Sequence, residues 1–372
     1  MEIAVIGAGI SGATVARLLA EQGHTITVIE QRNHIAGNCY DYENEDGVLI
    51  QKYGAHIFHT SSEEVYNLLS RFTEWIPYKH SVLGYVRERY VPIPFNFISI
   101  DKCFSERKAE EIKSSLIGEF GKSERVTIFD LMKSRTPLNR ELAFFVFENV
   151  FLHYTTKQWG RRPNELDSAV LSRVPIILGD NCLYFNDRYE GIPKNGFSTM
   201  VGRMLNHPNI TIITGRTFDA MEGSRYDHIF YSGRIDGFYW HTLGELGYRS
   251  LSFEFKTVES NEFQPCAVVN YTGKEPYTRV IEFKHFNGSK PNKTIIAREF
   301  PQEYRRGMNE PFYPIPNREN EEVFAKYRLR AKNERNVTFF GRLGDYRYYD
   351  IGDAVIRAME VVREFNSHGK TD

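Results

Sequence analysis

Residues 3–12 read Ile-Ala-Val-Ile-Gly-Ala-Gly-Ile-Ser-Gly, a short apolar strand that runs directly into the pattern Gly7-x-Gly9-x-x-Gly12. Glycines at these positions allow a tight turn, close approach of the backbone to a pyrophosphate, and close packing of the next helix on the strand. The N-terminus of that helix then offers free N–H groups and a favourable dipole to the phosphates. The stretch therefore predicts a dinucleotide-binding βαβ unit at the start of the chain.

The residues that follow the glycines support this prediction. A helical pattern covers 13–21, and a second strand over 25–29 ends in Glu30, 18 residues after Gly12. A carboxylate at this distance holds a ribose hydroxyl in dinucleotide-binding folds. The alternative is a glycine-rich turn in an α/β protein that binds no nucleotide.

Composition limits the classes of protein that this chain can be. Its 372 residues suffice for two or three domains, and 41% hydrophobic with 26% charged residues is typical of a soluble globular protein. Because 47 Lys and Arg balance 48 Asp and Glu, no net charge draws the chain to nucleic acid or to an anionic membrane. The 22 Tyr and 27 Phe also suit a pocket that stacks on a planar ligand.

Cysteine spacing and hydropathy indicate the compartment. The cysteines at 39, 103, 182 and 266 form no C-x-x-C pair, so we expect neither a dithiol redox centre nor a zinc site. Reduced thiols are typical of a cytoplasmic protein. A core strand at the second residue leaves no room for a signal peptide, and no apolar run reaches the roughly 18 residues that a membrane span needs.

Periodicity predicts the remaining organisation. The expected helices and strands are helices over 108–116, 142–151, 197–205 and 353–365, and strands over 210–213, 226–233 and 337–342. Residues 82–97 predict a hairpin whose second arm contains prolines and therefore forms a sheet edge. Short alternating runs over 248–300 predict an antiparallel sheet. Residues 160–180, with prolines and paired charges, are a candidate lid.

His56 and His59 stand three residues apart, close to Gly54. They could ligate a metal, lie in the core at a turn, or let backbone and imidazole approach a flat cofactor ring. Carboxylate or thiol partners at a usual spacing are missing, which argues against the metal. We favour the approach to a cofactor ring.

Two further segments carry side chains suited to a sugar nucleotide. Tyr154-Thr155-x-Lys157-Gln158-Trp159-Gly160 offers stacking rings and polar donors, and Arg173 on the candidate lid offers a cation for phosphate. The alternative for this segment is a helix end packed into the core.

Arginines close the remaining candidate sites. Arg279 ends Pro276-Tyr277-Thr278-Arg279, and Arg342 follows an apolar strand and precedes several tyrosines. An arginine among tyrosines can clamp a diphosphate, although lone arginines are commonly solvated. The helix start at Tyr349-Asp350 could direct its N-terminus at a cofactor ring, with Asp353 as a possible N-cap.

These residues resemble the UDP-galactopyranose mutase family of flavoenzymes nearly from end to end. The matching stretches are Gly7-x-Gly9-x-x-Gly12, Glu30-x-Arg32-x-His34-Ile35-x-Gly37-Asn38, Lys52-Tyr53-Gly54-Ala55-His56-Ile57-Phe58-His59-Thr60, Tyr154-Thr155-x-Lys157-Gln158-Trp159-Gly160, Tyr184-Phe185, Asp187-Arg188-Tyr189-x-Gly191-Ile192-Pro193, Tyr248-Arg249-Ser250-Leu251, Pro276-Tyr277-Thr278-Arg279, Glu310-Pro311-Phe312-Tyr313-Pro314 and Gly341-Arg342-Leu343 through Tyr348-Tyr349-Asp350.

The resemblance implies an α/β fold with a Rossmann-like FAD-binding domain, an inserted helical domain and an antiparallel β-sheet domain. The domain boundaries that we predict are 1–75, 188–240 and 335–372 for the discontinuous FAD-binding domain, 100–165 for the helical domain with a mobile lid at 160–180, and 76–99 and 241–334 for the sheet domain.

The resemblance also implies an isomerase that interconverts UDP-galactopyranose and UDP-galactofuranose. In the implied mechanism, N5 of reduced FAD attacks the anomeric carbon and expels the nucleoside diphosphate, and the sugar recloses in the other ring form. A nucleotide-sugar substrate, an unidentified reductant and a homodimer are expected, in a cytoplasmic protein that serves cell-envelope polysaccharide synthesis. We expect no nucleic-acid partner and no integral membrane contact.

The resemblance assigns roles to individual residues, with no metal site among them. The catalytic set is Arg173, Arg279, Arg342, His56 and Asp350. The substrate-binding set is His80, Tyr154, Thr155, Trp159, Arg173, Tyr184, Arg279, Tyr313, Arg342 and Tyr348. The cofactor-binding set is Gly7, Gly9, Ser11, Gly12, Glu30, Gln31, Arg32, Asn38, Gly54, His56, Ile57, Arg342, Tyr349 and Asp350.

Three stretches depart from the family pattern. His80-Ser81-Val82 replaces a usual Asn-Ser-Pro, Leu152-His153 stands where a glycine usually precedes Tyr-Thr, and Ile351 stands where Met is common. Because the changes fall near the sugar and base, dTDP-fucopyranose and UDP-N-acetylgalactosamine are alternative substrates for the same chemistry, and neutral drift is the other explanation. A flavin oxidoreductase of the amine-oxidase kind and a non-catalytic nucleotide-sugar binding protein are the competing classes.

Overall fold

The computed structural model describes residues 1–161, 175–289 and 292–368. The chain forms two compact units. They are Met1–Tyr78, Asp187–Arg249 and Met308–Asp372 for the first unit, and Lys79–Asn186 and Ser250–Gly307 for the second. Each unit is therefore assembled from segments that lie far apart in the sequence.

The first unit is built on a sheet of five parallel strands in the order β12-β2-β1-β13-β19. The strands are β1 (Glu2–Ile6), β2 (Thr25–Ile29), β12 (Ile210–Ile213), β13 (His228–Tyr231) and β19 (Val337–Phe339). The central strand β1 is buried on both faces, since Ile3 and Val5 join one apolar cluster and Ala4 and Ile6 join another. Alternate residues of a strand point to opposite faces, so the run of apolar residues fits a strand covered on both sides.

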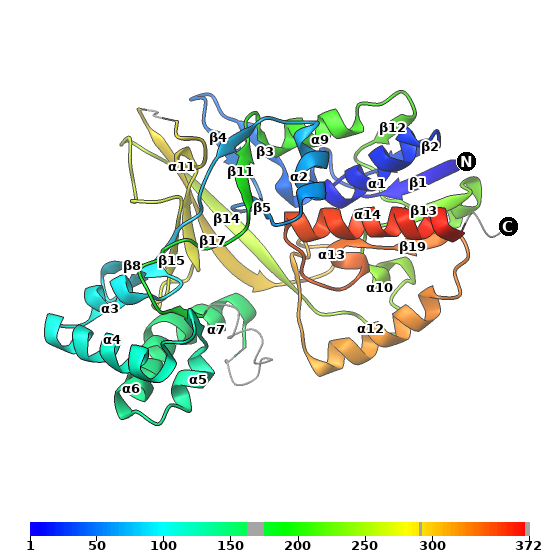
Figure 1. Ribbon diagram of the computed structural model, residues 1–372. Coiled ribbons are helices and arrows are strands. Elements are labelled where there is room, and N and C mark those ends of the chain that lie inside the picture. The colour runs from blue at the N-terminus through cyan, green and yellow to red at the C-terminus, as the bar shows by residue number, and fades with distance from the viewer. Residues whose placement is uncertain (162–174, 290–291, 369–372) are drawn as a thin grey trace. The chain divides into compact units, whose positions relative to one another are not determined.

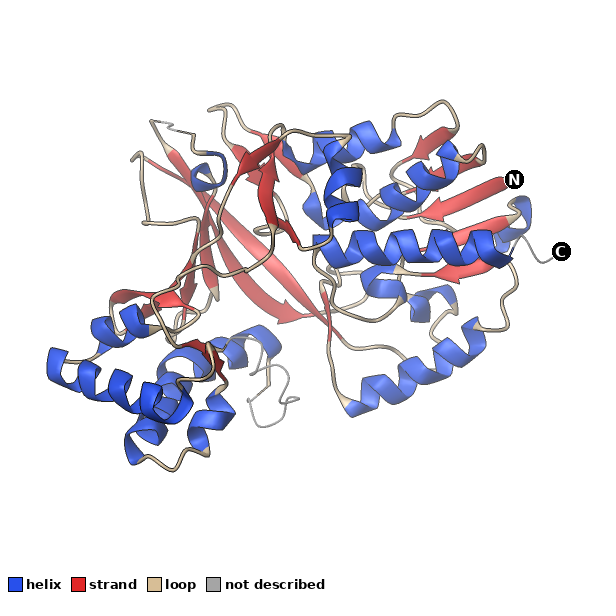
Figure 2. Ribbon diagram, viewed as in Figure 1, coloured by secondary structure: helices blue, strands red, loops and turns tan. Residues whose placement is uncertain are grey.

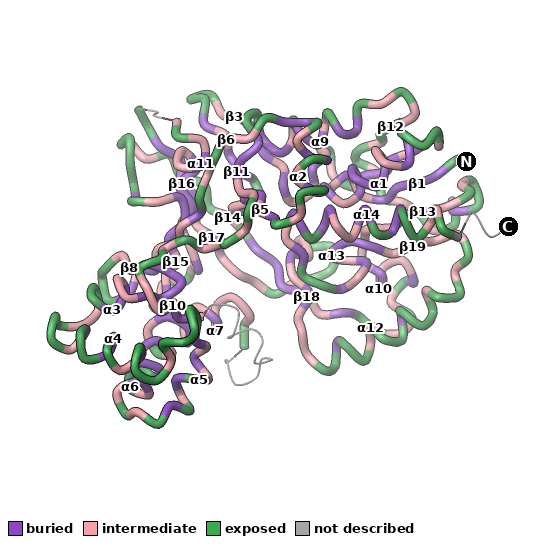
Figure 3. The backbone as a smooth tube through the Cα atoms, viewed as in Figure 1, coloured by how far each residue is buried: buried purple, intermediate pink, exposed green. Residues whose placement is uncertain are grey.

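Helices cover the face of this sheet toward which Ile3 and Val5 point. They are α1 (Ile10–Glu21), α2 (Glu63–Ser70), α9 (Gly196–Leu205) and α14 (Ile351–His368). Helices α1 and α14 run side by side (Figure 1), and residues of both join the apolar cluster of Ile3 and Val5. Figure 3 colours the buried residues of both helices purple. The Ser62 hydroxyl accepts from the Val65 N–H and caps α2, which agrees with the strong N-cap preference of serine.

Smaller elements complete the first unit. They are the antiparallel sheet β5-β11-β6 (Phe58–Thr60, Tyr189–Pro193, Trp75–Pro77), the hairpin β3-β4 (Asp41–Glu43, Leu49–Gln51), α10 (Ile235–Phe238), β18 (Tyr313–Pro314), α12 (Arg318–Ala331), α13 (Gly341–Gly344), and the 3-10 turns η1 (Gly37–Cys39) and η4 (Ala220–Arg225). The predicted strand over 337–342 is too long, because Phe339 ends β19 and Arg342 belongs to α13.

The second unit contains a larger sheet with the order β14-β17-β16-β15-β7-β8. Its strands are β7 (Val82–Val86), β8 (Arg89–Ile93), β14 (Tyr248–Val258), β15 (Val268–Tyr271), β16 (Arg279–Glu282) and β17 (Thr294–Glu303). Strand β14 begins in the first unit, where Tyr248 and Arg249 pair with β18. The proline-containing arm β8 lies at the sheet edge, as predicted.

The predicted antiparallel sheet also contains one parallel pair of strands. Val82 of β7 pairs with Val268 of β15 in parallel. These strands come from segments separated by the whole helical region, so no tight turn fixes their relative direction. Local alternation therefore indicated the strands and left this direction undetermined.

Helices make up most of the rest of the second unit (Figure 2). They are α3 (Phe97–Cys103), α4 (Glu106–Phe120), α5 (Ile128–Met132), α6 (Pro137–Val146), the π-helical turn η2 (Phe147–Leu152), α7 (His153–Trp159) and α11 (Lys284–Asn287). The predicted helix over 142–151 thus changes hydrogen-bond pattern at Phe147. Residues 162–174 of the candidate lid lie outside the described residues, and Ile176–Ile177 form β10, which pairs with β9 (Arg125–Val126). The three predicted domain boundaries stay a prediction.

Candidate functional site

Two glycines of the loop in the first unit, Gly7 and Gly12, leave no room for a side chain. Gly7 has φ +100°, and a Cβ there would lie 2.3 Å from the Ser232 Oγ. A Cβ at Gly12 would lie 1.9 Å from the carbonyl oxygen of Gly7. Gly9 precedes α1 and brings no side-chain cap to its first turn, which also contains no acidic residue. The first N–H groups of α1 are therefore available to an anion.

Glu30 lies at the end of β2, next to this loop, and is only 5% exposed. Its Oε2 accepts from the Ala8 N–H at 2.8 Å, and its Oε1 accepts from the Arg32 N–H at 2.9 Å. A carboxylate can accept about four hydrogen bonds, so both oxygens keep capacity for ligand hydroxyls. The predicted ribose-binding acid is thus oriented by two backbone N–H groups, one in the glycine loop and one just after β2.

Arg32 joins this end of the sheet to the 3-10 turn η1. Its Nη1 and Nη2 both donate to the Asn38 Oδ1 at 3.1 Å, and Nη2 pairs with Glu310 at 3.0 Å. The guanidinium also covers the Tyr53 ring at 4.5 Å. Two further predicted cofactor residues are Gln31 and Ser11. Gln31 is exposed, and the Ser11 hydroxyl donates to the Ala354 carbonyl of α14 at 3.5 Å.

His56 is held by its own loop. Its Nδ1 lies 2.9 Å from the carbonyl oxygen of Gly54, which has φ +97°, and Gln51 bonds both the N–H and the carbonyl of His56. Burial lowers the pKa of His56 to about 4, and the Arg342 charge acts in the same direction while the bond to Gly54 opposes it. The imidazole is therefore neutral near pH 7 and adds no positive charge to the site. Ile57 beside it is buried.

His59 takes different partners from His56. Its Nδ1 lies 2.9 Å from the Asp187 carboxylate, and its Nε2 lies 3.6 Å from that of Asp350. Asp350 in turn accepts the Asp353 N–H at 2.8 Å, at the start of α14. Asp350 therefore occupies the capping position that we had considered for Asp353. Among the described residues no three His, Cys, Asp or Glu side chains are arranged to hold a metal ion.

Arg342 gathers the predicted tyrosines of the first unit. It donates to the Phe312 carbonyl at 3.3 Å and to the Tyr349 carbonyl at 2.6 Å. Its guanidinium lies 4.8 Å from the Tyr348 ring centroid and 5.7 Å from that of Tyr313. Tyr349 contributes its backbone here, because its hydroxyl donates to Asp345 at 3.0 Å.

Arg279 gathers the predicted residues of the second unit. Its Nη2 donates to the Tyr154 hydroxyl at 2.6 Å, and its Nε lies 3.3 Å from the Glu299 carboxylate. Glu299 is 1% exposed and also accepts from the Thr278 hydroxyl, so the carboxylate of this ion pair is held in place. Burial raises the pKa of Tyr154, against the lowering effect of Arg279. The hydroxyl stays neutral and able to accept.

Tyr184 and His80 form a second aromatic group in this unit. The Tyr184 N–H donates to the His80 carbonyl at 2.8 Å, and the His80 ring, 4% exposed, lies 5.6 Å from the Phe185 ring and 5.7 Å from that of Tyr184. Thr155 is buried and Trp159 is half-buried near the end of α7. Arg173 lies outside the described residues.

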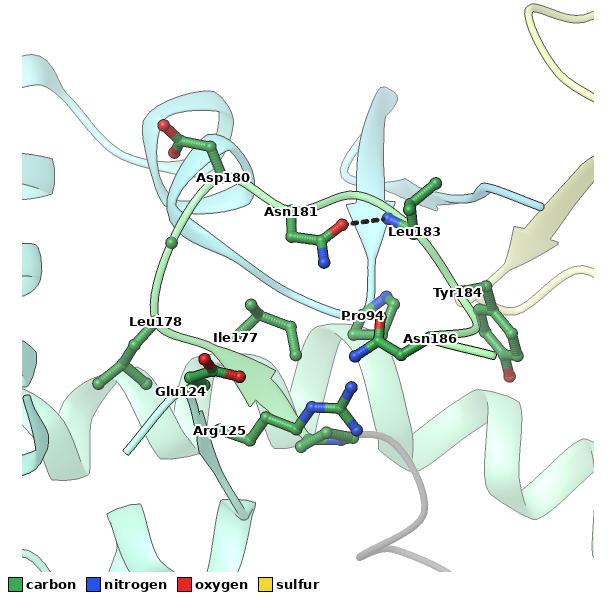
Figure 4. A pocket seen from close by; sticks show the side chains of 12 residues that line it. Pro94, Glu124, Arg125, Ile177, Leu178, Asp180, Asn181, Leu183, Tyr184 and Asn186 are labelled. Atoms are coloured by element: carbon green, nitrogen blue, oxygen red, sulfur yellow. Dashed lines mark hydrogen bonds between the residues drawn. The ribbon is translucent and has the colours of Figure 1, made fainter. Parts of the chain in front are cut away.

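A cavity of about 340 Å³ in the second unit borders this group (Figure 4). Its lining consists of Pro94, Glu124, Arg125, Pro175, Ile177, Leu178, Gly179, Asp180, Asn181, Leu183, Tyr184 and Asn186. Among these described residues only Tyr184 was predicted to bind substrate. The cavity therefore does not coincide with the predicted substrate-binding set.

Sequence reasoning missed several residues that hold the site together. Gln51 and Glu299 fix predicted residues from stretches that carry no motif of their own, whereas Asp187, which pairs with His59, comes from a matching stretch and was given no role. Asn270 lies directly opposite Arg279 in the β15–β16 register, and its buried Oδ1 has no hydrogen-bond partner within the described part of the chain. An alternation count over 268–282 could have paired Asn270 with Arg279, whereas no motif pointed to Gln51 or Glu299.

Comparison with known proteins places these geometries in context. Residues 149–348 match the family model described as UDP-galactopyranose mutase, and residues 5–72 match that of an NAD(P)-binding Rossmann-like domain. A probable UDP-galactopyranose mutase of Klebsiella pneumoniae is 37% identical, over 98% of this chain and 94% of the relative. The dTDP-fucopyranose mutase of Escherichia coli is 32% identical over 99% of both chains.

A crystal structure of reduced UDP-galactopyranose mutase shares the fold. Its TM-score is 0.76 over 98% of this chain and 94% of that chain, at 14% sequence identity. No helix in the described ranges is both long and apolar enough to cross a membrane.

Proposed function

Because this chain belongs to the UDP-galactopyranose mutase family, it is an isomerase that interconverts the pyranose and furanose forms of a nucleotide sugar, and we propose that UDP-galactopyranose is its substrate. The observation that supports a diphosphate-linked sugar as the substrate is the geometry of Arg279, whose half-buried guanidinium is held by Tyr154 and Glu299. A guanidinium fixed in this way is preorganised to bind phosphate oxygens. The identity of 37% to the Klebsiella pneumoniae relative supports UDP-galactopyranose in particular.

We further propose FAD in its reduced form as the cofactor of the first unit. The glycine loop fits a pyrophosphate, because Gly7 and Gly12 leave no room for a Cβ and the first turn of α1 is uncapped. Glu30 would hold a ribose through the lone pairs that its two backbone bonds leave. When bound, a reduced flavin supplies an electron-rich nucleophile for the anomeric carbon. The other proposed cofactor residues are Gly9, Ser11, Gln31, Arg32, Asn38, Gly54, His56, Ile57, Arg342, Tyr349 and Asp350.

The arginines act on the leaving group. Arg279 and Arg342 would bind the diphosphate and stabilise the negative charge that it gains when the bond to the anomeric carbon breaks. Tyrosine hydroxyls would donate to the same oxygens, and the α7 residues would contact the base and the sugar. The proposed residues are Tyr184, Tyr313 and Tyr348 for the phosphates, and Tyr154, Thr155, Trp159 and His80 for the base and sugar. Arg173 stays a sequence-based prediction.

The second candidate substrate is dTDP-fucopyranose. The Escherichia coli dTDP-fucopyranose mutase matches this chain over 99% of both lengths, and His80 is packed against Tyr184 and Phe185 in place of the usual family asparagine. An imidazole in this position would not make the contact that the amide makes to a sugar hydroxyl. A 6-deoxy sugar lacks one hydroxyl, so the loss of that contact fits such a substrate. UDP-N-acetylgalactosamine remains a third candidate.

Chromatography of reaction mixtures tests the proposal. Protein reduced with dithionite is incubated separately with UDP-galactofuranose and dTDP-fucofuranose, with unreduced protein as the control. We expect conversion of UDP-galactofuranose to UDP-galactopyranose by the reduced protein alone. Conversion of dTDP-fucofuranose only would replace the proposed substrate, and equal conversion without dithionite would contradict the reduced cofactor.

The proposal includes an external reductant of unidentified class and a cytoplasmic homodimer, which follow from the family resemblance. Analytical ultracentrifugation of the flavin-loaded protein tests the dimer directly.

A further inference from the structure

Helix α7 meets the β15–β16 connection at two points within the second unit. The Tyr154 hydroxyl accepts from Arg279 at 2.6 Å. Three residues later, the Lys157 Nζ donates to the carbonyl oxygens of Tyr271 at 2.7 Å and Tyr277 at 2.9 Å. Residues three apart lie on the same face of a helix, so both contacts come from one face of α7.

The two carbonyls that Lys157 binds stand on opposite sides of the connection between the strands. Tyr271 ends β15, and Tyr277 precedes Arg279, the first residue of β16, by two positions. The Tyr271 N–H donates to the Thr278 carbonyl at 2.8 Å, which closes the connection on itself. Lys157 therefore fastens both ends of this connection to the helix that also carries Tyr154.

Keeping an ammonium here has an electrostatic cost. Lys157 is half-buried, and burial lowers its pKa to about 8, against a raising effect of Glu275. An apolar side chain of similar length would avoid that cost of burying a charge. Two short hydrogen bonds to carbonyl oxygens offset it, because bonds with a charged donor are stronger than neutral ones. The ammonium therefore serves to hold the two backbone carbonyl groups in place.

We propose that Lys157 is a positioning residue for Arg279. It holds the β15–β16 connection against α7, so that the guanidinium stands beside Tyr154 before the diphosphate arrives. This inference rests on the proposed role of Arg279 as a diphosphate ligand. Lys157 acts through Arg279 and requires no contact with the substrate.

The test measures UDP binding to the full-length, flavin-loaded protein by calorimetry. We expect Lys157→Met to raise the Kd for UDP about tenfold, the loss that follows from removing charge-assisted hydrogen bonds that preorder a binding group. KM for UDP-galactofuranose should rise by a similar factor, with kcat changed less. Lys102→Met is the matched control, since the Lys102 Nζ also donates to a tyrosine carbonyl of this unit, that of Tyr90 at 2.9 Å.

A double-variant cycle separates positioning from general destabilisation. In an Arg279→Ala background, Lys157→Met should leave the Kd for UDP unchanged, because the group that it positions is gone. The same loss in both backgrounds, or no loss in either, would overturn the inference. If Arg279→Ala alone leaves UDP binding unchanged, the proposed role of Arg279 fails instead. Should Lys157→Met not fold, Lys157→Gln, which keeps an N–H donor, is expected to raise the Kd by a smaller factor than tenfold, and an unchanged Kd contradicts the inference.

Discussion

The two units hold their candidate ligands by different means. The proposed site of the first unit consists mainly of backbone, since it is formed by the glycine loop and the first turn of α1 beside the Glu30 carboxylate, and Ala8 and Glu30 are only 22 residues apart. The proposed site of the second unit consists of side chains, and its central contact joins Tyr154 to Arg279 across 125 residues. A backbone site tolerates almost no added atom, whereas a side-chain site loses function in steps.

Gly12→Ala tests the backbone site most severely. Because its Cβ would lie 1.9 Å from the Gly7 carbonyl oxygen, the turn has to open, and we expect a loss of about 3 kcal/mol in the free energy of unfolding together with loss of bound FAD. Gly118→Ala is the control, since no atom lies within 4 Å of its Cβ and alanine favours the helix. Urea unfolding and the ratio of flavin to protein absorbance give both readouts. Full flavin content in Gly12→Ala would contradict the proposal that the glycine loop binds the cofactor through its backbone.

Arg342→Ala tests a charged side chain of the first unit that we propose for the diphosphate. We expect kcat/KM for UDP-galactofuranose to fall about 10³-fold, the effect of removing a charged partner from a buried ion contact, while the flavin stays bound. Flavin retention is expected because the glycine loop and Glu30 do not depend on this guanidinium. Loss of the flavin in purified Arg342→Ala would show that, of its two proposed partners, the cofactor depends on this arginine and not the diphosphate alone.

Tyr154→Phe makes a smaller change in the second unit. The ring remains, and only the hydroxyl that accepts from Arg279 at 2.6 Å is removed. We expect UDP to bind about fivefold more weakly, which corresponds to one hydrogen bond of ordinary net strength. Tyr66→Phe, whose ring stacks on Tyr189 in the first unit, should bind UDP as the unmodified protein does. An unchanged Kd in Tyr154→Phe would mean that Glu299 alone orients Arg279.

His228→Gln addresses burial within the first unit, away from the candidate site. Burial lowers the pKa of His228 to about 4, so the unfolded chain binds a proton near pH 6.5 that the folded chain refuses. The free energy of unfolding should therefore fall as the pH drops from about 6.5 to 4. In the variant, which lacks this imidazole, the fall should be smaller by up to roughly 2 kcal/mol. Urea unfolding at each pH measures the difference. Parallel curves for the two proteins would contradict the burial of this imidazole.

The parts of the fold that the sequence predicted are those that depend on local pattern. The strand before Gly7, helix α1 and helix α9 follow from short-range apolar spacing. The parallel pairing of β7 with β15 and the end of β19 before Arg342 were missed, because strand direction and strand length depend on neighbours far along the chain.

The candidate site divides in the same way. The motifs and the family resemblance pointed to Glu30, Arg279 and Arg342 by residue, and they could not point to Glu299 or Asn270. These two residues belong to strands without a motif, and only the sheet register brings them beside Arg279.

By itself the sequence determined a nucleotide-binding βαβ unit, the mutase family and most of the residues proposed to bind cofactor and substrate, because each is encoded in contiguous residues with fixed spacing. Only the tertiary structure decided which side chains hold those residues in place. It set Glu299 behind Arg279, Lys157 against the β15–β16 connection, and His56 in a loop that keeps it neutral. Burial and long-range hydrogen bonds fix these features, and both arise only when distant segments of the chain pack together.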